Sequence, residues 1–171
     1  MSANRRTIQA QPLSAEQFAP FGSVIEVGDK TGRLVNQGRA QRIGGTRDLA
    51  HAAGTKPVID LYRVAKSELP FTVDCLERHP LSCQIFTPMR CSRYLVIVAP
   101  ADPAGKPDTS HALAFIGTAT QAICYGAGVW HAPMIALDDT AVMTMTMWET
   151  GDARDCEEFW LAPDHGLTIQ A

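Results

Sequence analysis

Strand-length apolar runs follow one another through the second half of this chain, with turn-forming residues between them. The run at 94–100 is dominated by β-branched residues, a shorter run covers 111–117, and 141–149 alternates Met with Thr. The connections at 101–108 and 136–140 carry Asp, Gly and Pro residues typical of turns. No long amphipathic helical pattern separates the runs, so a parallel sheet with covering helices is disfavoured. The pattern predicts hairpins that form an antiparallel β-barrel or a sandwich.

The N-terminal part of the chain predicts little regular structure apart from one short helix. Ser14 and Gln17 have the spacing of a capping box, which predicts a helix near 14–19. Residues 23–47 are rich in Gly, Asn, Gln and Arg, a composition typical of loops and short strands. We find no internal repeat, linker or low-complexity segment. We therefore expect one mainly β domain over residues 1–171, with a few short helices.

Composition narrows the range of partners. The chain has 171 residues, of which 46% are hydrophobic, and this is enough to bury the core of one domain. Its formal net charge is −3, and the Lys and Arg residues are spread thinly, so no basic face for a phosphate backbone is expected. A small-molecule ligand is therefore more plausible than a nucleic acid.

Neither a membrane segment nor a disulfide framework is evident. No stretch approaches the roughly 20 apolar residues of a membrane span, and the N-terminus lacks the apolar region of a secretory signal. The cysteines include no C-x-x-C pair, so neither a disulfide framework nor a thiolate zinc site is predicted. They are Cys75, Cys83, Cys91, Cys124 and Cys156. We expect a cytoplasmic protein with reduced, mostly buried thiols.

Polar side chains gather in a segment whose flanks have the pattern of buried strands. Glu77 and His79 are two residues apart, so a strand would point both to the same face, into a barrel interior if that face is the inner one. A one-residue slip in register would turn both outward. Gln84 follows in the same segment, and His131 lies in the apolar stretch 128–134. The sequence therefore indicates a polar cluster inside a barrel.

Each of these side chains also has a purely structural interpretation. Glu77 could form a solvated ion pair with Arg78, and His79 could be a turn residue before Pro80. Gln84 could satisfy backbone groups in a buried strand, and His131 could be a hydrogen-bonded core histidine. The functional interpretation rests on their joint spacing.

That joint spacing is similar to the two cupin motifs. Glu77, His79, Gln84 and Cys91 fit Glu-x-His-x4-Gln-x6-Cys, which has the spacing of the first motif, His-x-His-x3-4-Glu-x6-Gly. "GAGVWH", which ends at His131, supplies the Gly-x2-His part of the second motif. The resemblance implies a cupin-like antiparallel β-barrel, or double-stranded β-helix, with the motifs on strands that face each other across its mouth.

A closer resemblance covers nearly the whole chain. The stretches that carry it are "PLSAEQFAPFGSVIE" (12–26), "NQG" (36–38), "LERHPLSCQIFTPM" (76–89), "AFIG" (114–117), "GVWHAPM" (128–134) and "DCEEFWL" (155–161). In these the chain resembles the ureidoglycolate lyase family, which is cupin-like. The resemblance implies cleavage of ureidoglycolate to glyoxylate and urea late in allantoin degradation. It also implies a homodimer.

The implied chemistry can be assigned to the clustered side chains. Ureidoglycolate carries a hydroxyl, a carboxylate and a urea nitrogen on one carbon, so its cleavage needs a base, an acid and a cationic group for the carboxylate. Without a metal, we expect His131 as general base, His79 as general acid and Glu77 as the group that orients one of them. The predicted substrate-binding residues are Gln84, Arg90 as a carboxylate clamp, Asn36 and Trp148.

With a metal, the same residues would act as ligands. His79 and His131 offer nitrogen ligands and Glu77 an oxygen ligand, with Gln84 as a weak fourth. This set suits a divalent first-row ion, and the spacing does not select which one. The family resemblance implies nickel.

Several positions depart from the family pattern. Arg90 stands where Lys is usual, and Cys91 replaces the glycine that follows. The segment 36–38 is Asn-Gln-Gly in place of Asn-Asn-Gly, and Trp148-Glu149 occupies the place of an Asp-Arg pair. If that pair contacts substrate, a different ligand is implied, whereas Trp148 could equally belong to outer packing.

Two other functions stay open at this point. The first is a metal-dependent cupin enzyme, such as an isomerase or dioxygenase, acting on another small acid. The second is a cupin-like ligand-binding module without turnover. Against a merely structural role stands the cost of burying unpaired polar groups, about 1 to 3 kcal/mol each.

Overall fold

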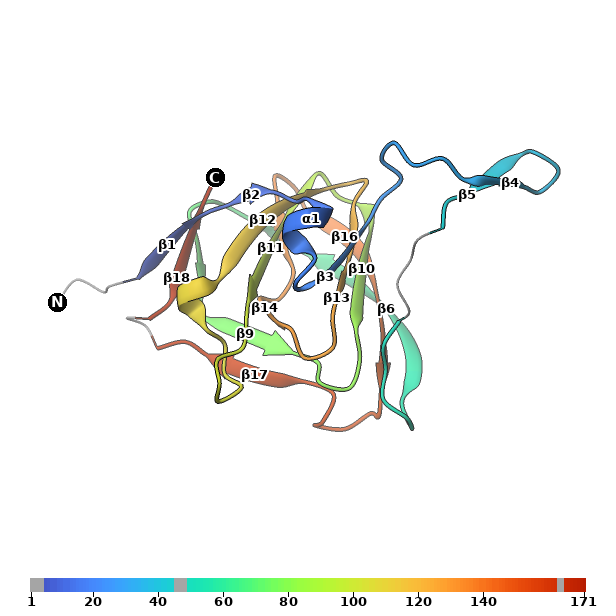
Figure 1. The fold of residues 1–171 in the computed structure, drawn as a ribbon. Helices are drawn as coiled ribbons and strands as arrows, with labels where there is room; N and C mark the ends of the chain where they lie inside the picture. The colour runs from blue at the N-terminus through green and yellow to red at the C-terminus, as the bar shows by residue number, and fades with distance from the viewer. Residues whose placement is uncertain (1–4, 45–48, 163–164) are drawn as a thin grey trace.

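The protein folds almost entirely into β-strands (Figure 1). The computed structural model describes residues 5–44, 49–162 and 165–171. The helices in these ranges are α1 (Ala15–Phe18) and a 3-10 helix at Thr109–His111. None of the described helices is long and apolar enough to cross a membrane. The strands are β1 (Arg6–Gln9), β2 (Gln11–Pro12), β3 (Gly22–Ile25), β4 (Arg33–Val35), β5 (Ala40–Arg42), β6 (Lys56–Val64), β7 (Lys66–Ser67), β8 (Phe71–Val73), β9 (Cys75–Arg78), β10 (Gln84–Arg90), β11 (Arg93–Ala99), β12 (Leu113–Thr118), β13 (Ala122–Tyr125), β14 (Trp130–His131), β15 (Ile135–Leu137), β16 (Ala141–Glu149), β17 (Glu157–Trp160) and β18 (Leu167–Gln170).

Two large sheets form the cupin-like barrel. One has the strand order β3-β13-β10-β16-β6, and the other has the order β17-β9-β14-β11-β12-β2, with β15 paired to β11 and β7 paired to β15. Pairing is antiparallel in both sheets except at β12/β2 and β15/β7. A smaller sheet, β1-β18-β8, completes the body of the barrel. The predicted mainly antiparallel β-barrel with few helices is confirmed.

The apolar patterns of two central strands follow from how the sheets are covered. Met143, Met145 and Met147 of β16 are all buried, as the alternation in 141–149 predicts. On β11, Val96 belongs to the core between the two large sheets, and Ile97 belongs to a second core that includes residues of β1, β8 and β18. β11 is therefore covered on both faces, and for that reason its sequence is a continuous apolar run.

The connections are predicted less well than the strands. Ser14 caps α1, and its Oγ accepts a hydrogen bond from the Gln17 backbone N–H at 3.3 Å, so the predicted helix is confirmed. Residues 101–108 join the antiparallel neighbours β11 and β12. The prediction of a hairpin at 136–140 is wrong, because β15 pairs with β11 whereas β16 pairs with β10 and β6. This segment crosses from one large sheet to the other.

A hairpin arm projects from the side of the barrel (Figure 1). It consists of β4, β5 and their turn, and its two strands pair only with each other among the described strands. Asn36 and Gln37 occupy the turn with φ values of 53° and 60°. Leu34 on β4 is 62% exposed. The arm therefore presents apolar as well as polar side chains to its surroundings.

Candidate active site

The polar cluster lies where the two large sheets approach each other. Glu77 on β9 is directly opposite His131 on β14, and His79 follows the end of β9. The ligand atoms of these three residues all lie within 4.8 Å of one another. Gln84 begins β10 in the other large sheet and its side chain reaches His131. The two motifs were expected on strands facing each other across the barrel, whereas β9 and β14 are neighbours in one sheet.

Both ring nitrogens of His131 face oxygen atoms. The Val129 carbonyl lies 2.9 Å from Nδ1, and because a carbonyl only accepts, Nδ1 carries a proton. Nε2 lies 3.1 Å from Oε1 of Gln84 and 3.5 Å from Oε1 of Glu77. The Tyr125 ring stacks on the imidazole with 4.0 Å between centroids. Nε2 of His131 therefore faces two acceptor oxygens, to which it can donate a hydrogen bond when it carries a proton.

His79 has a different environment. Its Nδ1 donates to the Asp155 carbonyl at 2.8 Å, which leaves Nε2 without a proton in the neutral ring. Nε2 is buried and has no hydrogen-bond partner among the described residues. Burial and the neighbouring charge of His131 lower the pKa of His79, despite the opposing effects of Asp155 and Glu77. A neutral imidazole with a free acceptor nitrogen therefore faces His131, at 5.5 Å between ring centroids.

Glu77 completes the cluster with an ionised carboxylate. Burial would raise the pKa of Glu77, but hydrogen bonding to His131 and the electrostatic effect of the neighbouring histidines outweigh it and lower the pKa. Its side chain keeps 21% of its surface exposed, whereas His131 keeps 2%. Glu77 is thus the most accessible member of the cluster, with the histidines behind it.

Comparison with known proteins places the chain in a family. Residues 5–169 match the family described as ureidoglycolate lyase. The chain is 36% identical to the ureidoglycolate lyase of Burkholderia mallei (strain NCTC 10229), with 97% of this chain and 99% of that protein covered. This chain belongs to the ureidoglycolate lyase family. The corresponding protein of Azotobacter vinelandii is 31% identical, over 96% of this chain and 98% of its own length.

Some solved structures align with most of this chain, at low sequence identity. A dTDP sugar isomerase from Desulfovibrio desulfuricans G20 aligns with a TM-score of 0.43 and 14% identity, over 84% of this chain and 83% of that one. Oxalate decarboxylase from Bacillus subtilis aligns with a TM-score of 0.41 and 11% identity, over 88% of this chain and 30% of that one.

The donor set of this ureidoglycolate lyase family member fits a divalent metal ion. Both histidines donate Nδ1–H to backbone carbonyls, the arrangement that fixes metal-binding histidines with Nε2 toward the ion. The unpartnered Nε2 of His79 would gain a partner. Glu77 adds one oxygen to the two nitrogens, a set that suits first-row divalent ions. Glu77, His79 and His131 could therefore hold such an ion.

Three of the predicted substrate-binding residues lie far from the cluster of Glu77, His79 and His131 in the same chain. Gln84 begins β10, and Arg90 is exposed at the other end of the same strand. Asn36 is exposed at the tip of the hairpin arm. Trp148 follows Met147, whose sulfur contacts Gln84, so alternation turns Trp148 to the outer face of β16. There it stacks on the ring of His51 with 5.0 Å between centroids. Their roles with substrate stay predictions.

The site also contains groups that sequence reasoning did not identify. Tyr125 stacks on His131, and the carbonyls of Val129 and Asp155 fix the two histidine rings. Every residue type has a carbonyl, so no sequence pattern reveals those two contacts. Tyr125 ends β13, which pairs with β10 so that Tyr125 lies opposite Gln84. Knowledge of that strand pairing would have placed Tyr125 beside the cluster.

Proposed function

We propose that this protein cleaves ureidoglycolate to glyoxylate and urea, in the allantoin branch of purine degradation. The observation that carries the proposal is the pairing of two unlike histidines. His79 offers a free Nε2, and His131 is surrounded by acceptors at both nitrogens. A proton acceptor and a proton donor thus stand side by side, in a family whose curated members are named ureidoglycolate lyase.

The reaction moves one proton and breaks one bond. A base removes the proton of the substrate hydroxyl, and the oxygen's electron pair forms the carbonyl of glyoxylate. The carbon–nitrogen bond breaks with its electrons going to nitrogen, and an acid protonates that nitrogen to give urea. Base and acid must therefore reach neighbouring atoms of one small molecule.

The hydrogen bonds favour roles opposite to those expected from the sequence. In the absence of a metal, the neutral His79 takes the hydroxyl proton at Nε2, because its Nδ1 is already committed to the Asp155 carbonyl. His131 acts as the proton donor through Nε2, because that nitrogen faces the side-chain oxygens of Gln84 and Glu77. The sequence left open which histidine Glu77 orients, and the 3.5 Å contact with Nε2 favours His131. Gln84 is proposed to contact the carboxylate or urea group.

A metal ion would change what these residues do. Glu77 and the Nε2 atoms of His79 and His131 would hold it, and the family resemblance implies nickel. When bound, the ion supplies Lewis-acid stabilisation of negative charge on a substrate oxygen. The Val129 and Asp155 carbonyls would then hold the two rings in their ligating orientation.

The function is tested by incubating purified protein with racemic ureidoglycolate and following glyoxylate, urea and ammonia. We expect equimolar glyoxylate and urea above the spontaneous rate, since the cluster carries both proton-transfer groups. A chelator-treated sample decides between the metal and metal-free roles. Production of ammonia in place of urea, or no turnover above the spontaneous rate, would contradict the proposed reaction.

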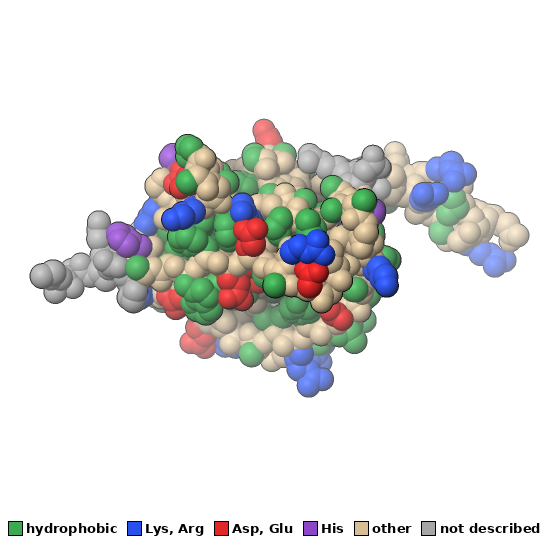
Figure 2. Space-filling model, turned by 90° about the horizontal axis from the view of Figure 1, so that it is seen from below, with side chains coloured by type: hydrophobic (Ala, Val, Ile, Leu, Met, Phe, Trp, Pro, Cys, Tyr) green, Lys and Arg blue, Asp and Glu red, His purple; other side chains and the backbone are tan. Residues whose placement is uncertain are grey.

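We also propose that the protein is a homodimer joined through the outer face of β6 and the hairpin arm. Ile59 and Leu61 point outward from β6 and are 71% and 70% exposed, while Met89 on β10 is 64% exposed. The arm carries Arg33, Arg39 and Arg42, all exposed. Figure 2 shows Lys and Arg side chains on the projecting arm, and both acidic and basic side chains on the barrel. Exposed apolar side chains beside a projecting arm suit a two-fold contact between copies.

Replacing Leu61 with aspartate should convert the dimer to monomer, because a buried unpaired charge at an apolar contact is costly. Light scattering after size exclusion should report twice 18.5 kDa for the unmodified chain and that single mass for the variant. Trp160→Asp is the control, since Trp160 is 69% exposed on β17, in the other large sheet. A dimer that persists in the Leu61 variant, or is lost in the Trp160 variant, would contradict this interface.

The cytoplasm is the proposed location. All the cysteines are free, but the expectation that most are buried is wrong, because only Cys83 and Cys124 are buried. Reduced thiols are typical of that compartment. The net charge of −3 supports a small-molecule substrate rather than a nucleic acid.

A further inference from the structure

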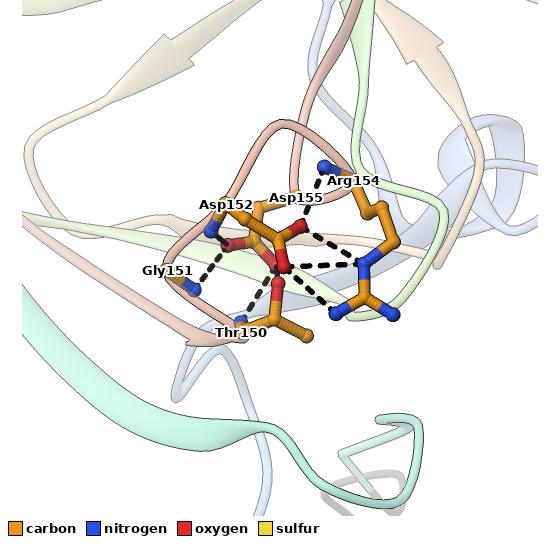
Figure 3. Close-up of polar contacts among 5 residues, drawn as sticks. All are labelled: Thr150, Gly151, Asp152, Arg154 and Asp155. Carbon is orange, nitrogen blue, oxygen red and sulfur yellow. Dashed lines mark hydrogen bonds and ion pairs between the residues drawn. The ribbon is translucent and has the colours of Figure 1, made fainter.

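The loop between β16 and β17 is organised by one carboxylate (Figure 3). The side chain of Asp155 accepts hydrogen bonds from the backbone N–H groups of Thr150 and Gly151 at 2.7 Å each, and from that of Asp152 at 3.1 Å. It also accepts from the Thr150 hydroxyl at 2.8 Å. Desolvation opposes ionisation, but these hydrogen bonds lower the pKa of Asp155. An ionised carboxylate thus closes the turn on itself.

The main chain of the same residue reaches the candidate active site. The Asp155 carbonyl accepts from Nδ1 of His79 at 2.8 Å. The side chain of Asp155 therefore fixes the loop, and its carbonyl fixes the histidine. No other hydrogen bond to the His79 ring is found among the described residues, and its Nε2 is buried without a partner.

We propose that Asp155 is a positioning residue that selects the tautomer of His79. A neutral imidazole carries one ring proton, and a carbonyl at Nδ1 keeps that proton there, so Nε2 is left free inside the cluster. Whether Nε2 then acts as a base or as a metal ligand rests on the proposed function. The selection of the tautomer is independent of the proposed function.

The effect depends on the carboxylate because it accepts four hydrogen bonds from residues 150–152, whereas the backbone N–H of Asp155 makes a single one, to the Asp152 carbonyl at 3.1 Å. Without the carboxylate, the N–H groups of residues 150–152 lose a shared acceptor, and the turn that presents the carbonyl can open. Gly151 sits in this turn with φ of 83°, a conformation that glycine adopts without strain. The ring of His79 would then exchange its proton between the two nitrogens.

Asp152 provides a matched control within the same loop. Its carboxylate binds Arg154, with distances of 2.7 to 3.2 Å to the side-chain nitrogens, and its backbone N–H still donates to Asp155 in an Asp152→Asn variant. Asp152→Asn and Asp155→Asn change the charge of the loop equally. Only Asp155→Asn alters the group that holds the carbonyl toward His79.

The test is the long-range ¹H–¹⁵N spectrum of histidine in metal-free protein. In the unmodified chain and in Asp152→Asn, we expect His79 as the Nδ1–H tautomer, with Nε2 unprotonated. In Asp155→Ala and Asp155→Asn we expect averaged signals from both tautomers, and in Thr150→Val a smaller change in the same direction. Thr150→Ser should keep the signals of the unmodified chain.

Affinity for Ni²⁺ alone, measured by calorimetry, gives a second readout. Loss of a group that orients a ligand typically weakens binding roughly 10- to 100-fold, so Asp155→Ala should fall in that range and Asp152→Asn should not. Circular dichroism establishes folding, and if the alanine variant does not fold, Asp155→Asn and Thr150→Val decide.

The proposal is overturned if His79 is the Nε2–H tautomer in the unmodified chain. It is also overturned if the tautomer is unchanged in folded Asp155 variants. Neither measurement uses ureidoglycolate, so a chain with the expected tautomers and no turnover would refute the proposed function alone.

Discussion

Replacing His131 with alanine should lower kcat/KM for ureidoglycolate cleavage by about 100- to 10,000-fold, the range ascribed to one general acid–base group. His131 is the only described side chain that hydrogen-bonds Gln84 and forms an ion pair with Glu77 at once. Its removal therefore deletes the proton donor and leaves the Glu77 carboxylate without its partner. Steady-state release of glyoxylate, corrected for the spontaneous rate, measures the effect.

His111→Ala is the control for that experiment. His111 is exposed and pairs with Asp108 beside the 3-10 helix, outside the cluster, so its loss should leave the rate unchanged. A fall in kcat without a change in KM would indicate a group that acts in the transition state. An alanine variant of His131 that folds and keeps its rate within threefold would remove this histidine from the mechanism.

Replacing Glu77 with glutamine should weaken the binding of Ni²⁺ by about 70-fold or more. Structural zinc sites bind their ion with about 10 to 16 kcal/mol shared among four ligands, so each ligand accounts for roughly 2.5 to 4 kcal/mol, which corresponds to this factor. Glutamine keeps the size of the side chain but removes the charge that stabilises His131. Calorimetric titration of chelator-treated protein measures the affinity.

Activity of the Glu77 variant separates the two models of the site. If no metal takes part, the variant should still lose activity, because the protonated ring of His131 has lost its carboxylate partner, and added Ni²⁺ should not restore it. Glu68→Gln is the control, since Glu68 is exposed and pairs with Lys66 outside the cluster. Unchanged metal affinity in the Glu77 variant would exclude this carboxylate as a ligand.

The fold was predictable where residue type is decided by burial on a strand. The alternation of Met and Thr in β16 indicates a strand with one buried and one partly exposed face. The apolar run of β11 indicates a strand that is covered on both faces. The crossing at 136–140 was not predictable, because Asp138 and Asp139 suit a turn of either kind. The Met side chains of the following strand, β16, are buried in the core, and no residue of 136–140 indicates which sheet that strand joins.

The cluster was predictable because strand alternation and motif spacing are local patterns that can be recognised within a few residues of the sequence. Glu77 and His79 are close in sequence, and His131 was placed by its resemblance to the second cupin motif. Arg90 and Trp148 were selected from the same stretches but point elsewhere, since the face of a strand changes with every residue. Whether 1–171 is a single domain and which residues hold the substrate stay predictions.

The contact between Nδ1 of His131 and the main-chain carbonyl of residue 129 affects which substitutions the site can tolerate. His131 is oriented by an atom that every amino acid possesses, so exchange of the Val129 side chain does not remove the contact. A protein built this way can accumulate substitutions beside its reactive ring while the ring keeps its proton on the same nitrogen. The proton position at Nδ1 of His131 therefore depends on the path of the backbone at residue 129 and not on the side chain found there.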